Sequence, residues 1–82
     1  MLEQRAALTT GMEVVDIVAD RIGYVKQIRD VDFLVDRPMK RDLYVPFHAV
    51  KQVQDDIVVV DVITENIADM GWEHPPLVGG AS

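Results

Sequence analysis

Apolar and polar residues alternate along most of the chain, and this period of two is typical of half-buried β-strands rather than of helices. The alternating segments are short, and polar or turn-forming residues separate them at regular intervals. The pattern predicts six strands, over residues 12–18, 22–29, 31–36, 43–46, 50–54 and 57–63. Six short strands with turn residues between them indicate a small antiparallel β-barrel or sandwich.

The turns between these strands are short and polar. Residues 19–21 make a hairpin of the first two strands, and residues 55–56 turn the chain between the last two. Gly23 indicates a β-bulge or a close approach by another backbone. Such a bulge is also needed if the apolar residues Ile22, Val25 and Ile28 are to fit the alternation of one strand.

Two segments have helical features. Residues 47–49 are too few for more than one helical turn. After the sixth strand, Thr64 can cap a short helix through its hydroxyl, with Ile67 and Met70 as the apolar face. Gly71 is typical of the position just after a helix. We therefore expect a short C-terminal helix.

The length of 82 residues allows one domain. We expect an N-terminal arm over residues 1–10, a barrel-like domain over residues 11–70, and an extended tail rich in proline and glycine over residues 71–82. Such a tail is not expected to order by itself. Hydrophobic burial and conformational entropy nearly balance in so small a domain, so a dimer or a docked partner would add stability.

The sixth predicted strand is apolar on both faces. One face is formed by the valines at alternate positions, Val58, Val60 and Val62. We expect this face to point into the core. The opposite face contains three large apolar residues besides Asp61, namely Ile57, Val59 and Ile63. Either the C-terminal helix folds back over this second face, or the face is a surface for a second copy or another protein.

Composition excludes several classes of protein. The chain has no cysteine, which rules out disulfides, thiolate zinc sites and cysteine nucleophiles. The net charge of −6 disfavours nucleic acid and anionic membrane surfaces as direct ligands. No apolar run is long enough to span a bilayer, and the first residues do not form a signal peptide. We therefore expect a cytoplasmic protein that does not insert into membranes.

The chain contains no recognisable catalytic set. Most aspartates lie at predicted turns, where the carboxylate can accept hydrogen bonds from nearby backbone amides. Asp16, Asp36 and Asp61 lie within or at the end of strands. We expect such acids to pair across the sheet with a basic residue, namely Lys26, Arg29 or Arg41. No serine or threonine has a histidine and an acid at a recognisable spacing. We therefore predict no enzyme, no metal site and no cofactor.

Three features allow more than one interpretation. His48 lies at a corner between strands, where it is either a plain surface residue or a pH-sensitive or ligand-binding group. The only basic cluster is formed by Arg37, Lys40 and Arg41, and it is either a solvated loop or a site for phosphate or an acidic partner. Trp72, the only tryptophan, should dock on its own barrel, on a second protomer or on a separate protein.

A series of short motifs follows the predicted strands in order: Gly11, Val14-Val15-Asp16, Ile22-Gly23-Tyr24-Val25, Tyr44-Val45-Pro46 and Ala49-Val50. This series resembles PRC-barrel domains, and more narrowly it is similar to a family of small bacterial proteins related to them. The resemblance covers residues 11–67. It departs from the family at Ala19-Asp20-Arg21, where such proteins often have Asp-Gly.

The resemblance implies a six-stranded β-barrel with a short helix. Known relatives include the cytoplasmic part of the photosynthetic reaction-centre H subunit. Another is the C-terminal domain of a ribosome maturation factor, which docks a ribosomal protein. These are domains for protein binding and assembly rather than enzymes, so the resemblance implies no catalytic residue.

Together these observations predict an all-β protein, a small six-stranded antiparallel PRC-type barrel that acts as a non-catalytic interaction or assembly module. Its partner is another protein or a second copy, with a homodimer expected. The residues expected to contact the partner are Tyr44, His48, Ile57, Val59, Ile63 and Trp72. The alternative is a regulatory domain that binds a small molecule or a metal through His48 and nearby acids.

Overall fold

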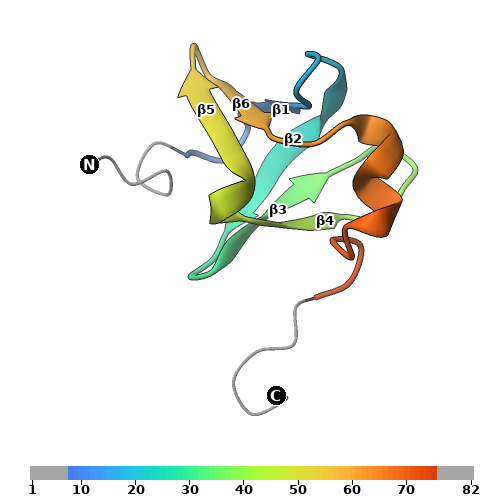
Figure 1. Ribbon diagram of the computed structural model, residues 1–82. Coiled ribbons are helices and arrows are strands. Elements are labelled where there is room, and N and C mark those ends of the chain that lie inside the picture. The colour runs from blue at the N-terminus through green and yellow to red at the C-terminus, as the bar shows by residue number, and fades with distance from the viewer. Residues whose placement is uncertain (1–7, 76–82) are drawn as a thin grey trace.

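The computed structural model describes residues 8–75, with six strands and two 3-10 helices (Figure 1). The strands are β1 (Glu13–Val15), β2 (Arg21–Ile28), β3 (Asp32–Asp36), β4 (Leu43–Pro46), β5 (Val50–Gln54) and β6 (Ile57–Val60). The helices are η1 (Phe47–Ala49) and η2 (Thr64–Asp69). All six predicted strands are confirmed, although β1 and β6 are shorter than predicted. Residues 1–7 of the predicted arm and residues 76–82 of the predicted tail lie outside the described residues.

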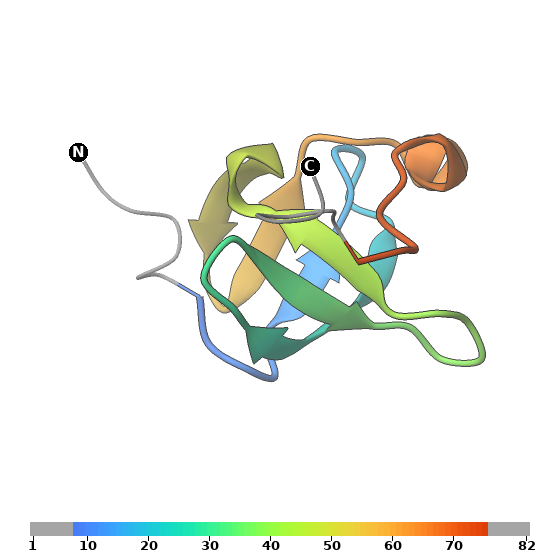
Figure 2. The same cartoon turned by 90° about the horizontal axis from the view of Figure 1, so that it is seen from below.

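The six strands form one sheet in the order β4-β3-β2-β1-β6-β5, which curls into a half-barrel (Figures 1 and 2). Neighbouring strands are antiparallel except for β1 and β6, which run parallel. The prediction of a wholly antiparallel barrel is therefore wrong at this pair. The reason is η1, which turns a corner between β4 and β5 without reversing the chain. The β5–β6 hairpin consequently meets β1 in the parallel direction.

Two irregularities in β2 bend the sheet. The pairing of β2 skips Ile22 opposite β1 and skips Lys26 opposite β3. Ile22 and Val25 are both buried, as the predicted bulge requires. A Cβ atom at Gly23 would lie 2.2 Å from the carbonyl oxygen of Asp36 in β3, so only glycine fits there. The bulge and the close backbone approach predicted for this strand are both confirmed.

The curled sheet encloses the hydrophobic core. The most deeply buried apolar residues come from four strands: Val14, Phe33, Val35, Leu43, Val45, Val58 and Val60. Val62 is also buried, which confirms the predicted inner face of the last strand and its continuation. Leu8 and Trp72 belong to the same core, so the packed unit extends past both ends of residues 11–70.

The segment after β6 differs from the predicted C-terminal helix. It is a 3-10 helix, η2, whose Ile67 is buried as predicted. Met70 is 44% exposed, so its predicted place on the apolar face is wrong. The reason is that Met70 follows the last residue of η2, where Gly71 (φ +76°) turns the chain away. Neither helix within residues 8–75 has the length and hydrophobicity needed to cross a lipid bilayer.

A buried carboxylate joins the β1–β2 turn to η2. Asp16 is 0% exposed, and its Oδ1 accepts hydrogen bonds from the amides of Val18 and Asp20, at 3.0 and 2.8 Å. Its Oδ2 accepts hydrogen bonds from the amide of Thr64, at 2.9 Å, and from the Thr64 hydroxyl. The prediction that Thr64 caps the helix through its own hydroxyl is therefore wrong. Asp16 satisfies the first amide of η2 instead.

These hydrogen bonds keep Asp16 ionised. Burial by itself would raise the pKa of the carboxyl, but four hydrogen bonds from Thr64, Asp20 and Val18 lower the pKa below the ordinary value of 3.8. At neutral pH the carboxylate is therefore charged and bound on both oxygens. It fixes η2 to the end of β1.

The prediction that Asp16 pairs with a basic residue is therefore wrong. Two basic residues on or just after β2 bind other acids. Lys26 Nζ lies 2.7 Å from Asp42, and Arg29 Nε lies 2.7 Å from Asp32. A strand pattern shows that Asp16 follows β1, but it does not show that the carboxylate points toward the start of η2.

Candidate functional site

The six residues predicted to contact a partner are distributed over separate surfaces. Tyr44, His48 and Trp72 line one groove. Ile57 and Val59 line a shallow hollow on the outer face of the sheet. Ile63 is exposed just before η2 and lines neither surface.

The groove that contains Tyr44, His48 and Trp72 is called here the aromatic groove, and it encloses about 370 Å³. Strand β4 contributes Tyr44 and Pro46, and η1 contributes His48. The remaining wall consists of the segment after η2 and the start of β3. Among residues 8–75, the lining consists of Val31, Asp32, Tyr44, Pro46, His48, Met70, Gly71, Trp72 and His74.

Trp72 holds one wall of the aromatic groove in place. Its carbonyl oxygen accepts a hydrogen bond of 2.7 Å from the amide of Tyr44, so this segment lies along the outer edge of β4. Its side chain is 7% exposed and packs into the core. Of the three docking places considered for Trp72, its own barrel is the one observed. The ring therefore supports the groove mainly from below.

The aromatic groove has little unbalanced charge. Asp32 is the only carboxylate among the described residues of its lining, and Arg29 binds both carboxylate oxygens, at 2.7 and 3.2 Å. The guanidinium of Arg29 also lies 5.2 Å from the ring centre of Tyr44. The other polar side chains of the lining include Tyr44, through its hydroxyl, and the exposed imidazoles of His48 and His74. The groove therefore suits an apolar group better than an ion.

The second surface is the outer face of β1, β6 and β5, and is called here the outer face. Two rows of side chains cross it, because Glu13 pairs with Ile57 and Val15 with Val59, while Gln54 and Gln52 continue the rows on β5. Together with Ala19 and Asp55 these residues line a hollow of about 360 Å³. The prediction that the C-terminal helix covers this face is wrong. In both views η2 lies on the side of the molecule away from β5 (Figures 1 and 2).

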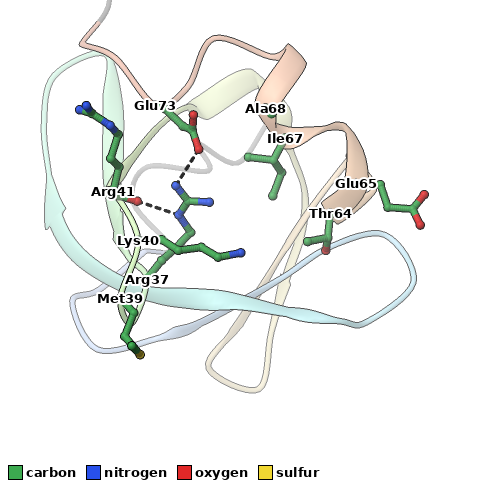
Figure 3. A pocket seen from close by; sticks show the side chains of 9 residues that line it. All are labelled: Arg37, Met39, Lys40, Arg41, Thr64, Glu65, Ile67, Ala68 and Glu73. Carbon is green, nitrogen blue, oxygen red and sulfur yellow. Dashed lines mark hydrogen bonds and ion pairs between the residues drawn. The ribbon is translucent and has the colours of Figure 1, made fainter.

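The third surface is a groove between the β3–β4 loop and η2, shown in Figure 3, with a volume of about 500 Å³. Arg37 lies at its centre and is 9% exposed. Its Nε donates to the carbonyl of Arg41 at 2.7 Å, and its Nη2 lies 3.0 Å from Glu73. Arg37 is thus an internal clamp between the loop and the segment that follows η2. Lys40 and Arg41, at the rim, are exposed.

The arrangement offers no metal centre among the described residues. No group of three histidine, aspartate or glutamate side chains comes together within residues 8–75. His48 shares its groove with a single acid, Asp32, whose oxygens are already bound by Arg29.

Sequence reasoning missed several residues of the aromatic groove, notably Val31, Met70 and His74. Val31 and Met70 are large exposed apolar residues at its rim. No local signal identifies them, because they come from a turn before β3 and from the segment after η2. Contacts between residues far apart in sequence, among them the hydrogen bond between Tyr44 and Trp72, bring that segment beside β4.

A comparison with protein-family models finds no match, and a search of curated proteins finds no similar sequence. The resemblance to PRC-barrels therefore remains an expectation from the sequence motifs. The function has to be argued from the surfaces of this chain.

Proposed function

We propose that this protein is a non-catalytic interaction module and that its aromatic groove receives a large apolar side chain from a partner protein. The observation that carries the proposal is the lining of the groove. Tyr44, Pro46 and Trp72 form an apolar floor and wall, and exposed Met70 and Val31 stand at the rim. Pockets of this size that bury aromatic or aliphatic anchors are common centres of binding energy.

Insertion of a side chain fits this groove better than addition of a strand. Strand β4 is an edge of the sheet, but the amide of Tyr44 already donates to the carbonyl of Trp72. An extended peptide that added a strand to β4 could therefore not bond to the amide of Tyr44, in the middle of the strand, without displacing Trp72. A side chain that enters the groove from outside meets no such obstacle.

Charge defines the partner further. The chain carries a net charge of −6, while the single carboxylate in the groove is neutralised by Arg29. A partner segment with an apolar anchor flanked by lysine or arginine would be attracted by the whole molecule and would bury no unpaired charge. We therefore commit to a short basic segment with a large apolar side chain.

The wider expectations belong to the same proposal. We also propose that the protein is a PRC-type barrel used for assembly, and the curled shape of the six-stranded sheet supports this proposal. The cytoplasmic location is proposed from composition alone. The alternative, a regulatory site for a small molecule or metal at His48, uses the same groove and is tested with the variant His48→Ala.

Trp72 is the only tryptophan, so its fluorescence reports on the groove. A peptide library displayed against the full chain is expected to yield basic peptides that share a large apolar residue and shift the Trp72 emission. Met70→Glu removes an apolar contact at the rim and would bury a carboxylate beside the apolar anchor. This cost exceeds the attraction of the carboxylate for the basic flanks, so the variant should weaken these peptides about tenfold or more. Met39→Glu is the matched control, because Met39 is fully exposed and lies outside the groove.

Two outcomes would contradict the proposal. One is a library that yields no shared apolar residue. The other is a set of peptides that Met70→Glu and Met39→Glu weaken equally. A shift in melting temperature with divalent metals or acidic metabolites, lost in His48→Ala, would favour the regulatory alternative instead.

A further inference from the structure

We propose that two copies of this protein pair through strand β5, antiparallel about a twofold axis at Val53. This inference concerns a surface that the proposed peptide groove does not use. Strand β5 is the second edge of the sheet. Within residues 8–75, no strand pairs with its outer side.

The backbone of Val53 is directed toward that free edge. The turn between β5 and β6 is Asp55-Asp56, both at positive φ (55° and 64°), which is typical of a two-residue hairpin. The pair that closes such a turn, Gln54 with Ile57, forms both of its hydrogen bonds within the hairpin. Because bonding alternates along an antiparallel pair, the N–H and C=O of Val53 point outward.

A twofold axis at Val53 matches these groups with themselves. The Val53 residues of two copies would exchange two hydrogen bonds, as residues of a narrow antiparallel pair do. Gln52 of each copy would lie opposite Gln54 of the other. These two glutamines already hydrogen-bond each other within one chain, so their side chains suit one another.

Charge selects this register over the others. Centring on Val53 brings Lys51 of one copy opposite Asp55 of the other, twice per dimer. Neither side chain forms an ion pair within the described residues. Centring on Lys51 would bring two lysines together, and centring on Asp55 would bring two aspartates together. Opposite charges meet only when Val53 is the centre.

The same features limit the strength of the dimer. Strand β5 is short, and its pairing with β6 skips Lys51, which indicates a bulge at that residue. A lysine and a bulge at an edge commonly protect a sheet from indiscriminate pairing. Here they confine the contact to the residues around Val53. The dimer should therefore be weak and reversible, at the small end of protein interfaces.

Sedimentation velocity of the full chain, from about 10 µM to about 1 mM, tests this inference. The average mass should rise with concentration toward that of a dimer. Lys51→Asp should weaken the dimer about tenfold or more, because it replaces two attractive pairs with two repulsive ones. Adding Asp55→Lys to that variant should restore dimerisation.

Controls separate the specific pair from net charge. Lys40→Asp changes the charge equally but lies in the β3–β4 loop, so it should leave the dimer unchanged. The double variant Lys40→Asp with Asp55→Lys has the same net charge as Lys51→Asp with Asp55→Lys. It should nevertheless dimerise weakly, because Lys51 then faces another lysine. Because Asp55 lies at positive φ, Asp55→Asn is a second variant that removes the charge with less backbone strain.

A protein that stays monomeric over the whole range would overturn the inference. A dimer that tolerates Lys51→Asp as well as Lys40→Asp would overturn it too, because another surface would then hold the copies together. Met70→Glu, in the aromatic groove, should leave the dimer intact. Failure of the dimer and failure of the proposed peptide site can therefore be told apart.

Discussion

The two edge strands of the sheet, β4 and β5, differ in whether another segment of the described chain bonds to their outer side. At the β4 edge, the segment after η2 lies alongside the strand, and the Trp72 carbonyl receives the amide of Tyr44. At the β5 edge, no strand within the described residues pairs with the outer side, toward which the backbone of Val53 points. One edge is thus closed from within the chain, and the other is left with unpaired backbone groups and a face that includes Ile57 and Val59.

The difference shows how a half-barrel of this size can combine stability with binding. Closing β4 requires Trp72 in the core, and that segment is also held by the ion pair between Arg37 and Glu73. The segment after η2 that closes the β4 edge also forms one wall of the aromatic groove. The open edge keeps a backbone template for a second copy.

The largest effect is expected from breaking the closed edge. Trp72→Ala removes a buried indole from the core, and we expect a loss of about 3–5 kcal/mol in the free energy of unfolding. Such a loss is a large part of the stability of a small domain. Urea denaturation followed by circular dichroism measures it. Met39→Ala, at a fully exposed site, should change stability by less than about 0.5 kcal/mol.

A smaller loss is expected where η2 is tied to β1. Asp16→Asn keeps the shape of the side chain but turns an amide NH₂ toward the donors of Thr64. Hydrogen bonds to a charged group contribute about 1.5–3 kcal/mol each, so we expect a loss of about 2–3 kcal/mol. Thr64→Val, which removes only the hydroxyl, should cost less. Equal losses in the two variants would contradict the role given to the Thr64 amide.

The same carboxylate predicts a pH dependence. Since the pKa of Asp16 is lower in the folded protein than its ordinary value of 3.8, its contribution is fully present above that value. The contribution is lost as the pH falls through the folded-state pKa. Denaturation between pH 7 and pH 2 should therefore show a steeper acid loss in the native protein than in Asp16→Asn. Parallel curves would exclude Asp16 as a source of acid sensitivity.

The smallest effect is expected from the clamp on the closing segment. Arg37 is buried, but Glu73 is partly exposed, so we expect Glu73→Gln to cost about 1 kcal/mol. A double-mutant cycle with Arg37→Met isolates the coupling between the two side chains. A coupling near zero would show that Arg37 acts through the Arg41 carbonyl alone.

The sequence predicts those features of the fold that depend on the residue pattern within a single strand. Alternation places Val58 and Val60 in the core, and a glycine in a strand signals the close approach of Asp36 to Gly23. Alternation contains no information on the relative direction of distant strands, so the parallel pairing of β1 with β6 could not be predicted. That direction depends on the corner at η1.

The candidate sites show the same division. Tyr44, His48 and Trp72 were selected one by one, and the fold brings them to one groove. The sequence does not indicate Met70 or His74 as groove residues, because their place depends on contacts between residues far apart in sequence. The role of Asp16 could not be predicted for a similar reason, since its partner Thr64 is 48 residues away.

Hydrogen exchange at the two edges tests the central claim most directly. The amide of Tyr44, bound to the Trp72 carbonyl, should be protected at every protein concentration. The amide of Val53 should exchange rapidly in dilute solution and slow down as concentration rises, and Lys51→Asp should abolish that slowing. Protection of Val53 that is independent of concentration, or rapid exchange at Tyr44, would contradict the account of one closed and one open edge.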